Sequence, residues 1–261
     1  GGRLEASGAL ARARLTIHSL RLTGARPGAL ATAPRAREAL AALLLDLDVA
    51  GAFDALRVRA TLSSPTTRLE AALATDGATL APGARVEGHL GAEDLSPLLA
   101  PLALDGAPLA VRAALSGRWA RPAIALTLEG GANTVALGPA RAPLEALRVE
   151  AHLDEDGLAI DEASARLAGG RVRLAALRSR AFGGALARLT AEGVDLGRIE
   201  RVSRELTGAL HLELVAWQLD GSAPGARADA RVGAPRYLGV ARFAELFSRY
   251  GLRMPGREAR E

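Results

Sequence analysis

The densest group of side chains able to do acid–base or metal chemistry is the consecutive run Asp154, Glu155 and Asp156, which Gly157 follows. A pair of carboxylates can act as general acid and base, and a calcium loop spreads its oxygen ligands over about 12 residues. Here the acidic residues are adjacent and lie between two segments with a strand-like pattern. We therefore interpret the run as a solvated turn, with a catalytic pair or a calcium loop as the alternatives.

The other residues suited to catalysis or metal binding are isolated. Each of the four histidines lies in or beside a segment of alternating apolar residues, where a polar side chain faces solvent: His18, His89, His152 and His211. The chain has no cysteine, which excludes a disulfide scaffold, a Cys-based zinc site and a thiol nucleophile. It also lacks G-x-S-x-G, H-E-x-x-H, P-loop and G-x-G-x-x-G motifs. We predict no catalytic residues, no metal, no cofactor and no enzymatic activity.

Basic and aromatic residues give little support for nucleic-acid binding. The best basic cluster comprises Arg171, Arg173, Arg178 and Arg180, but acidic residues intervene throughout the chain and the net charge is only +4. Aromatic residues, on which bases would stack, make up 3% of the sequence. We predict a charged outer face and no nucleic-acid partner. Trp119 and Trp217 are interpreted as packing residues or edge covers, with contact to a ligand as the alternative.

The elements that position these residues are predicted to be strands. Ala, Leu, Arg and Glu dominate the composition, which alone would suggest long helices. Along most of the chain, however, apolar residues alternate with polar ones at a period of two, as from Leu56 to Leu62. That period places the apolar residues on one face of a strand, whereas a helix needs spacings of three and four.

The breaks between strands predict a meander of antiparallel neighbours. Asp-Gly pairs suit tight hairpin turns and occur at 76–77, 105–106, 156–157 and 220–221. A few short helices are expected at 35–42, 94–99, 196–206 and 240–250. The predicted fold class is mainly β: a long antiparallel meander rolled into a U-shaped, taco-like groove with a few short helices.

Length and apolar content predict a folded protein of one or two domains. The chain has 261 residues, of which 49% are apolar. Residues 1–50 are expected to hold N-terminal strands and a short helix, 51–235 a repetitive antiparallel sheet, and 236–261 a helix-like segment. Within 51–235, Asp94, Gly106 and Gly117 recur at similar intervals as Asp195, Gly208 and Gly221, which predicts two approximate repeats of about a hundred residues.

A sheet with one apolar face must cover that face with a second sheet, close into a barrel, or fold over into a trough. A trough lined by aliphatic side chains favours hydrocarbon, because each methylene moved out of water is worth about 0.8 kcal/mol. The candidate lining residues are the large apolar members of the alternating segments: Leu56, Val58, Leu62, Leu109, Val111, Leu115, Ile124, Leu126, Leu128, Leu147, Val149, Leu153, Leu210, Leu212 and Leu214.

Several phrases resemble the repeating sheet of the AsmA-like and TamB-like proteins. The pattern similar to theirs is a Leu-x-Gly, a few residues, a proline and then an alternating strand, as in residues 115–128, and the resemblance covers roughly 50–235. The phrases are residues 115–128, 143–153, 156–161, 167–172 and 193–199, the last leading to 206–208.

The resemblance implies a hydrophobic β-groove that carries phospholipid between the inner and outer membranes of a Gram-negative cell envelope. It also implies a periplasmic location and, for TamB-like members, an outer-membrane assembly partner. The N-terminal membrane helix typical of these families is not found in this sequence, so we expect anchoring in the inner membrane through segments outside it.

The predicted function is thus a non-enzymatic lipid-binding and transfer module that contacts phospholipid acyl chains. The alternative is a structural or adhesive β-repeat scaffold with a closed core and no ligand. A closed sandwich usually fills its centre with large side chains, so the low aromatic content favours the groove.

Overall fold

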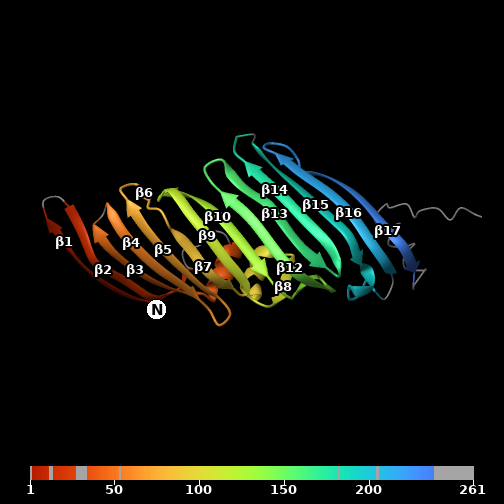
Figure 1. The fold of residues 1–261 in the computed structure, drawn as a ribbon, viewed down its shortest axis with the longest axis horizontal. Helices are drawn as coiled ribbons and strands as arrows, with labels where there is room; N and C mark the ends of the chain where they lie inside the picture. Colours follow the sequence, from red (N-terminus) through yellow and green to blue (C-terminus); the bar gives the residue numbers. More distant parts are fainter. Residues whose placement is uncertain are drawn as a thin grey trace, which may run out of the picture.

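The computed structural model describes residues 2–11, 14–27, 34–52, 54–181, 183–203 and 206–237. It is mainly β, and its strands form one large antiparallel sheet, which confirms the predicted fold class at that level. Figure 1 shows the strands side by side in chain order, as a long twisted ribbon. The predicted segment 236–261 lies outside the described residues from 238 onward.

The sheet contains long strands through most of its width. In chain order they are β1 (Arg3–Ala11), β2 (Arg14–Ala25), β3 (Leu44–Ala52), β4 (Ala55–Ser63), β5 (Arg68–Asp76), β6 (Thr79–Leu80), β7 (Arg85–Leu90), β8 (Leu102–Gly106), β9 (Leu109–Arg118), β10 (Arg121–Gly130), β11 (Asn133–Leu137), β12 (Ala140–Leu153), β13 (Gly157–Leu167), β14 (Gly170–Ser179), β15 (Gly184–Asp195), β16 (Leu206–Leu219) and β17 (Gly225–Tyr237).

The pairing follows the chain closely. Strands β1 to β5 pair in sequence, β7 joins β5 to β9, and β12 to β17 again pair in sequence. In the middle, β9 pairs with β10 while β8 pairs with β11, and the long β12 pairs with both β10 and β11. Thus β8 continues into β9 in the same direction, and β10 continues into β11 in the opposite direction beside them. The two pairs of strands each take the place of one long strand in the meander.

Cross-strand register gives the sheet one apolar face. Directly opposed residues in antiparallel strands point to the same side. One continuous row therefore crosses twelve strands on one side: Leu45, Leu62, Leu69, Gly88, Val111, Leu128, Val149, Ala163, Leu174, Leu189, Leu214 and Ala228. We call the side that carries this row the apolar face. The opposite side, which carries Asp48, Arg59, Arg85, Arg112, Glu150 and Arg173, is called the charged face.

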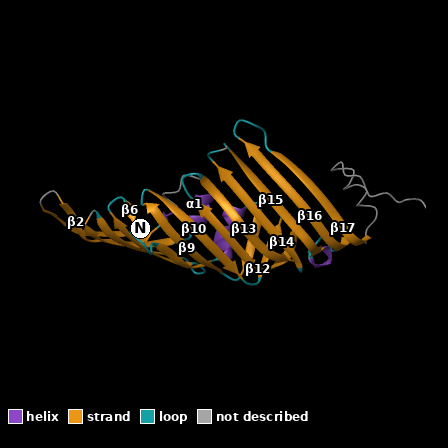
Figure 2. Cartoon of the chain, turned by 45° about the horizontal axis from the view of Figure 1, so that its top comes forward, coloured by secondary structure: helices purple, strands orange, loops and turns teal. Residues whose placement is uncertain are grey.

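Short helices cover two parts of the apolar face. The helix α2 (Ala92–Leu99) buries Ala92 against Leu104 and Leu109, and α1 (Pro34–Ala41) contacts α2. Further along, the 3-10 turn η2 (Leu196–Arg198) lies beside a second cluster that contains Ala142 and Val194. Figure 2 shows the helices in purple against the sheet. Both clusters leave the face between and beyond them uncovered.

The helix expected over 196–206 is wrong in extent. Only Leu196–Arg198 form a 3-10 turn, and β16 already begins at Leu206. Arg201 has a φ of 73°, in the left-handed region, which stops a right-handed helix at that point. The helices expected over 35–42 and 94–99 are found as α1 and α2, each shifted by one or two residues, and 240–250 lies outside the described residues.

The Asp-Gly pairs are turns at three of the four predicted places. Gly77 and Gly221 lie in the connections from β5 to β6 and from β16 to β17, with φ values of 60° and 77°, and Gly157 directly follows the turn as the first residue of β13, with a φ of 154°. Gly106 is different, because the chain continues from β8 into β9 without reversing. Glycine is needed there because the backbone of Asn133 lies close by: a Cβ at Gly106 would be 2.9 Å from the Cα of Asn133.

The predicted boundary between residues 50 and 51 falls inside β3. This strand pairs with β2 on one side and β4 on the other, so β1 and β2 extend the same sheet. The two predicted repeats share one local feature: a short helical segment leads into a strand that contains a glycine of positive φ. This glycine is Gly106 at the end of β8, with a φ of 130°, and Gly208 near the start of β16, with a φ of 135°. The repeat itself stays a prediction.

A buried polar network fixes α2 to the connection between β4 and β5. The Asp94 carboxylate accepts hydrogen bonds from the hydroxyls of Thr67 at 2.6 Å and Ser64 at 2.8 Å. Thr67 is 1% exposed, and its hydroxyl oxygen also accepts from the backbone N–H of Gly91 at 2.8 Å. One carboxylate therefore links the helix on the apolar face to the β4–β5 connection, and the Ser96 hydroxyl links the same helix to the backbone of Leu104 on β8.

We expect Asp94→Ala to lower the free energy of unfolding by about 1–3 kcal/mol, because it leaves the buried Thr67 hydroxyl without an acceptor. Urea denaturation measures the change. Glu93→Ala is the matched control: Glu93 is exposed and accepts one bond from Thr66 at 3.0 Å, so its loss should cost less than about 0.5 kcal/mol. Equal effects of the two variants would contradict this role of Asp94.

Candidate functional site

A hollow of about 560 Å³ lies on the apolar face, between the region of α2 and η2. Only apolar atoms are exposed in its wall, whereas two larger hollows, of about 690 and 710 Å³, are lined largely by polar and charged side chains such as Arg59, Glu87 and Glu150. The volume of the apolar hollow is that of an ordinary small-molecule site. The side chains that form it come from β8, β11, β12, β13, β14, β15 and the η2 connection: Leu102, Val135, Leu137, Leu144, Leu147, Leu167, Val172, Leu174, Leu189, Ile199 and Val202.

A second hollow, of about 300 Å³, adjoins the first on the same strands. In β14 the first hollow uses Val172 and Leu174, and the second continues with Ala176 and Arg178. The same succession occurs in β13 and β15, where Ala163 and Leu189 of the first are followed by Ile160 and Ala187 of the second. Together the two hollows form a path along β13 to β16, which we call the groove.

The groove has a length suited to an extended hydrocarbon chain. At 3.3 Å of rise per residue, the six steps from Val172 to Arg178 span about 20 Å. The side chains in the middle of its floor are small, because Ala176, Ala187 and Ala216 lie opposite one another on three neighbouring strands. Small residues there leave room above the sheet.

Register places all fifteen predicted lining residues on the apolar face. Only Leu147 among them lines the hollow of about 560 Å³. Leu109 and Val111, with 1% and 6% of their surface exposed, are core residues. Leu109 packs with Ala92 of α2, and its prediction as an accessible lining residue is corrected accordingly.

Most of the residues that line the groove are not among the fifteen predicted from the sequence. Val172, Leu174 and Leu189 belong to strands with the same alternation as the predicted ones, so the pattern that selected the others could have found them. Ile199 and Val202 could not be found in this way, because they reach the groove from the η2 connection and not from a strand.

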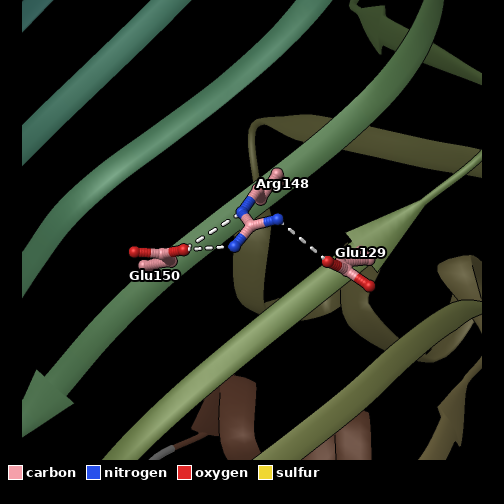
Figure 3. A network of polar contacts seen from close by, with 3 residues as sticks. All are labelled: Glu129, Arg148 and Glu150. Carbon is pink, nitrogen blue, oxygen red and sulfur yellow. Dashed lines mark hydrogen bonds and ion pairs between the residues drawn. The ribbon is translucent and has the colours of Figure 1, made fainter.

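The charged face balances its own charges. Arg148 bridges Glu150 at 2.6 Å and Glu129 at 3.2 Å, as Figure 3 shows. The hydrogen bond to Glu150, more than any other contact, raises the pKa of Arg148. Arg188 similarly pairs with Glu213 at 2.8 Å. These pairs are exposed, so each adds little stability, and they give a mixed surface rather than a basic one.

The predicted basic cluster does not act as one surface. Arg171 and Arg173 oppose Glu192 and Thr190 on the charged face, as predicted for an outer face. Arg178 instead lies on the apolar face, which corrects its assignment. Arg180 follows the end of β14 and donates to the backbone carbonyl of Glu155 at 3.4 Å.

The carboxylate run is a turn. Asp154 lies in the connection from β12 to β13, where its backbone N–H donates to the carbonyl oxygen of Gly157 at 3.0 Å. Its side chain accepts hydrogen bonds from the backbone N–H groups of Asp156 and Gly157 at 2.9 and 3.1 Å. Among the described residues, no group of three His, Asp or Glu side chains is arranged to hold a metal ion.

One histidine has an acidic neighbour on the charged face. His152 Nδ1 lies 2.8 Å from a carboxylate oxygen of Asp161, on the adjacent strand. This hydrogen bond raises the pKa of His152 above its ordinary value of 6.5 because it favours the charged imidazolium. The stabilisation is fully present below pH 6.5 and is lost as the pH rises through the raised pKa.

We expect Asp161→Asn to return the pKa of His152 toward 6.5, which an NMR titration of the imidazole protons measures directly. His89, which is also on the charged face but lies on β7, provides internal reference signals in the same spectra. A His152 titration that is identical in both proteins would contradict the pairing.

Asn133 is the buried polar group that lacks a partner among the described residues. It is 6% exposed in β11, and neither its Oδ1 nor its Nδ2 makes a hydrogen bond there. It lies outside both hollows, opposite Gly106 and Leu144. Its amide is thus not part of the groove.

No protein-family model matches the chain, and neither does any of the curated proteins or solved structures compared with it. Within the described ranges, no helix has the length and apolar character needed to cross a bilayer.

Proposed function

We propose that this chain is a non-enzymatic lipid-binding module whose apolar sheet face carries phospholipid acyl chains. In this proposal the sheet curls along its length into a U-shaped trough with the apolar face inside. The trough belongs to a periplasmic protein, anchored through other segments, that moves phospholipid between the two membranes of the cell envelope. An outer-membrane assembly protein is its partner.

The observation that carries the proposal is the groove along β13 to β16. Its larger part exposes only apolar atoms, which suits hydrocarbon and offers nothing to a polar substrate. Each methylene placed there gains about 0.8 kcal/mol. The row of Leu, Val, Ala and Gly residues continues the same surface across twelve strands, as a conduit requires.

The scaffold alternative needs a cover for the apolar face. Among the described residues, the cover consists of α1, α2 and η2, and no second sheet packs on this face. Leu102 and Leu137 at the rim of the hollow of about 560 Å³ remain 41% and 55% exposed. A closed core would bury such residues, so the exposed rim favours a ligand.

Site-directed photocrosslinking tests the proposal. A photoreactive phenylalanine analogue at Leu174 points into the groove, and the same analogue at Arg173 lies one residue away on the charged face. After irradiation in cells, position 174 should yield a phospholipid adduct in mass spectra and position 173 should not. Adducts at both positions, or at neither, would contradict a groove on the apolar face.

A further inference from the structure

One charged side chain lies on the apolar face at the end of the groove. By register, the paired positions of this face on β13 to β16 hold Arg178 as their single charged residue. Arg178 opposes Leu158 on one side and Ala185 on the other. Its guanidinium has no hydrogen-bond or ion-pair partner among the described residues, unlike those of Arg148 and Arg188 on the charged face.

A second polar side chain faces Arg178 across a small residue. Ala185 opposes Arg178 on β14 and Gln218 on β16, so the three residues form one row on the apolar face. Because alanine separates them, the two long side chains can both reach the space above Ala185. Arg178, Ala185 and Gln218 all line the smaller hollow.

The rows of side chains on the apolar face become more apolar with increasing distance from Arg178 along the strands. Beyond the Arg178 row comes a row of alanines, and beyond that Leu174, Leu189 and Leu214. The hollow of about 560 Å³, with its purely apolar wall, follows at the η2 end. The groove thus has one cationic end and one hydrocarbon end.

We infer that the groove binds an anionic amphiphile in one orientation, with its phosphate at Arg178 and Gln218 and its acyl chain directed toward η2. This inference rests on the proposed function and adds the headgroup class and the direction of the tail. The guanidinium supplies a charge-assisted, bidentate contact to a phosphate, and the Gln218 amide donates a further hydrogen bond. An uncharged lipid gains only the apolar contacts.

Calorimetric titration of the full 261-residue chain tests the inference with probes used below their micelle-forming concentrations. Dodecyl phosphate is the anionic probe, dodecyl glucoside has the same tail without charge, and inorganic phosphate has the charge without a tail. We expect Arg178→Gln to weaken dodecyl phosphate binding about tenfold, as the loss of a charge-assisted hydrogen bond implies. Dodecyl glucoside binding should not change.

Arg173→Gln is the matched control, because it removes the same charge from the same strand on the opposite face. It should leave the binding of both detergents unchanged, and inorganic phosphate at millimolar concentration should not displace dodecyl phosphate. Equal binding of dodecyl phosphate to wild type and Arg178→Gln would overturn the inference. Displacement by inorganic phosphate would also overturn it, because it would indicate a site for free anions.

The outcomes separate this inference from the proposed function. If both detergents bind and Arg178→Gln has no effect, the groove stands and the assigned orientation is wrong. If neither detergent binds to the wild-type chain, the proposed function fails and the inference fails with it.

Discussion

Replacing Leu189 by aspartate should weaken the binding of an acyl chain by about tenfold or more. Leu189 lies in the middle of the groove, between Leu174 on β14 and Leu214 on β16. A carboxylate at this point must either lose its hydration when the hydrocarbon enters or exclude the hydrocarbon. Titration with a fluorescent fatty-acyl probe measures the change in affinity.

Two further variants make this result specific. Thr190→Asp adds the same charge one residue away on the charged face and should leave binding unchanged. Ala187→Phe keeps the groove apolar but fills the space over the alanine row, and it should also reduce binding. If Leu189→Asp and Ala187→Phe fold and still bind the probe like the wild type, acyl chains do not use this groove.

The largest loss of stability is expected from Gly88→Ala. Gly88 lies in the row that crosses the sheet, between Leu69 and Val111, and has a φ of 146°. An added Cβ would overlap the backbone carbonyl oxygen of Arg68, and neither backbone can move without breaking the pairing of β5 and β7. Strained backbone of this kind costs about 1–3 kcal/mol before the overlap is counted, so we expect a loss of about 3 kcal/mol or more.

Gly131→Ala is the control for Gly88→Ala. No atom lies within 4 Å of a Cβ built at Gly131, so the change should be under about 1 kcal/mol. Thermal and urea unfolding, followed by circular dichroism at a β-sheet wavelength, compare the two variants. A Gly88→Ala protein as stable as the Gly131→Ala protein would contradict the backbone geometry described for β7.

The period of two was sufficient to predict the sheet and its apolar face, because alternation and pairing agree along most strands. It was insufficient at the end of β14. There the apolar pattern shifts by one residue at Leu177, while the pairing with β15 stays regular from Arg171 to Ser179. The backbone therefore turns Leu177 to the charged face and Arg178 to the apolar face. The neighbouring strands decide this, and alternation within one strand cannot reveal it.

The sequence pattern also could not predict which parts of the apolar face the helices would cover. Leu109 has the same alternation as Leu147, yet α2 buries the first while the second lines the groove. Leu109 lies under α2, which Asp94 links to Thr67 and Ser96 links to Leu104, whereas Leu147 packs at the edge of the same cluster. Contacts between segments that are far apart in sequence set both the boundary of the groove and its depth.

The most direct test of the central claim is native mass spectrometry with lipid extraction, on the chain purified from a bacterial periplasm in detergent-free buffer. We expect bound phospholipid in the wild type and in Thr190→Asp, and its loss in a folded Leu189→Asp protein. A folded wild-type chain that contains no lipid would contradict the claim that the apolar face is an open hydrocarbon groove.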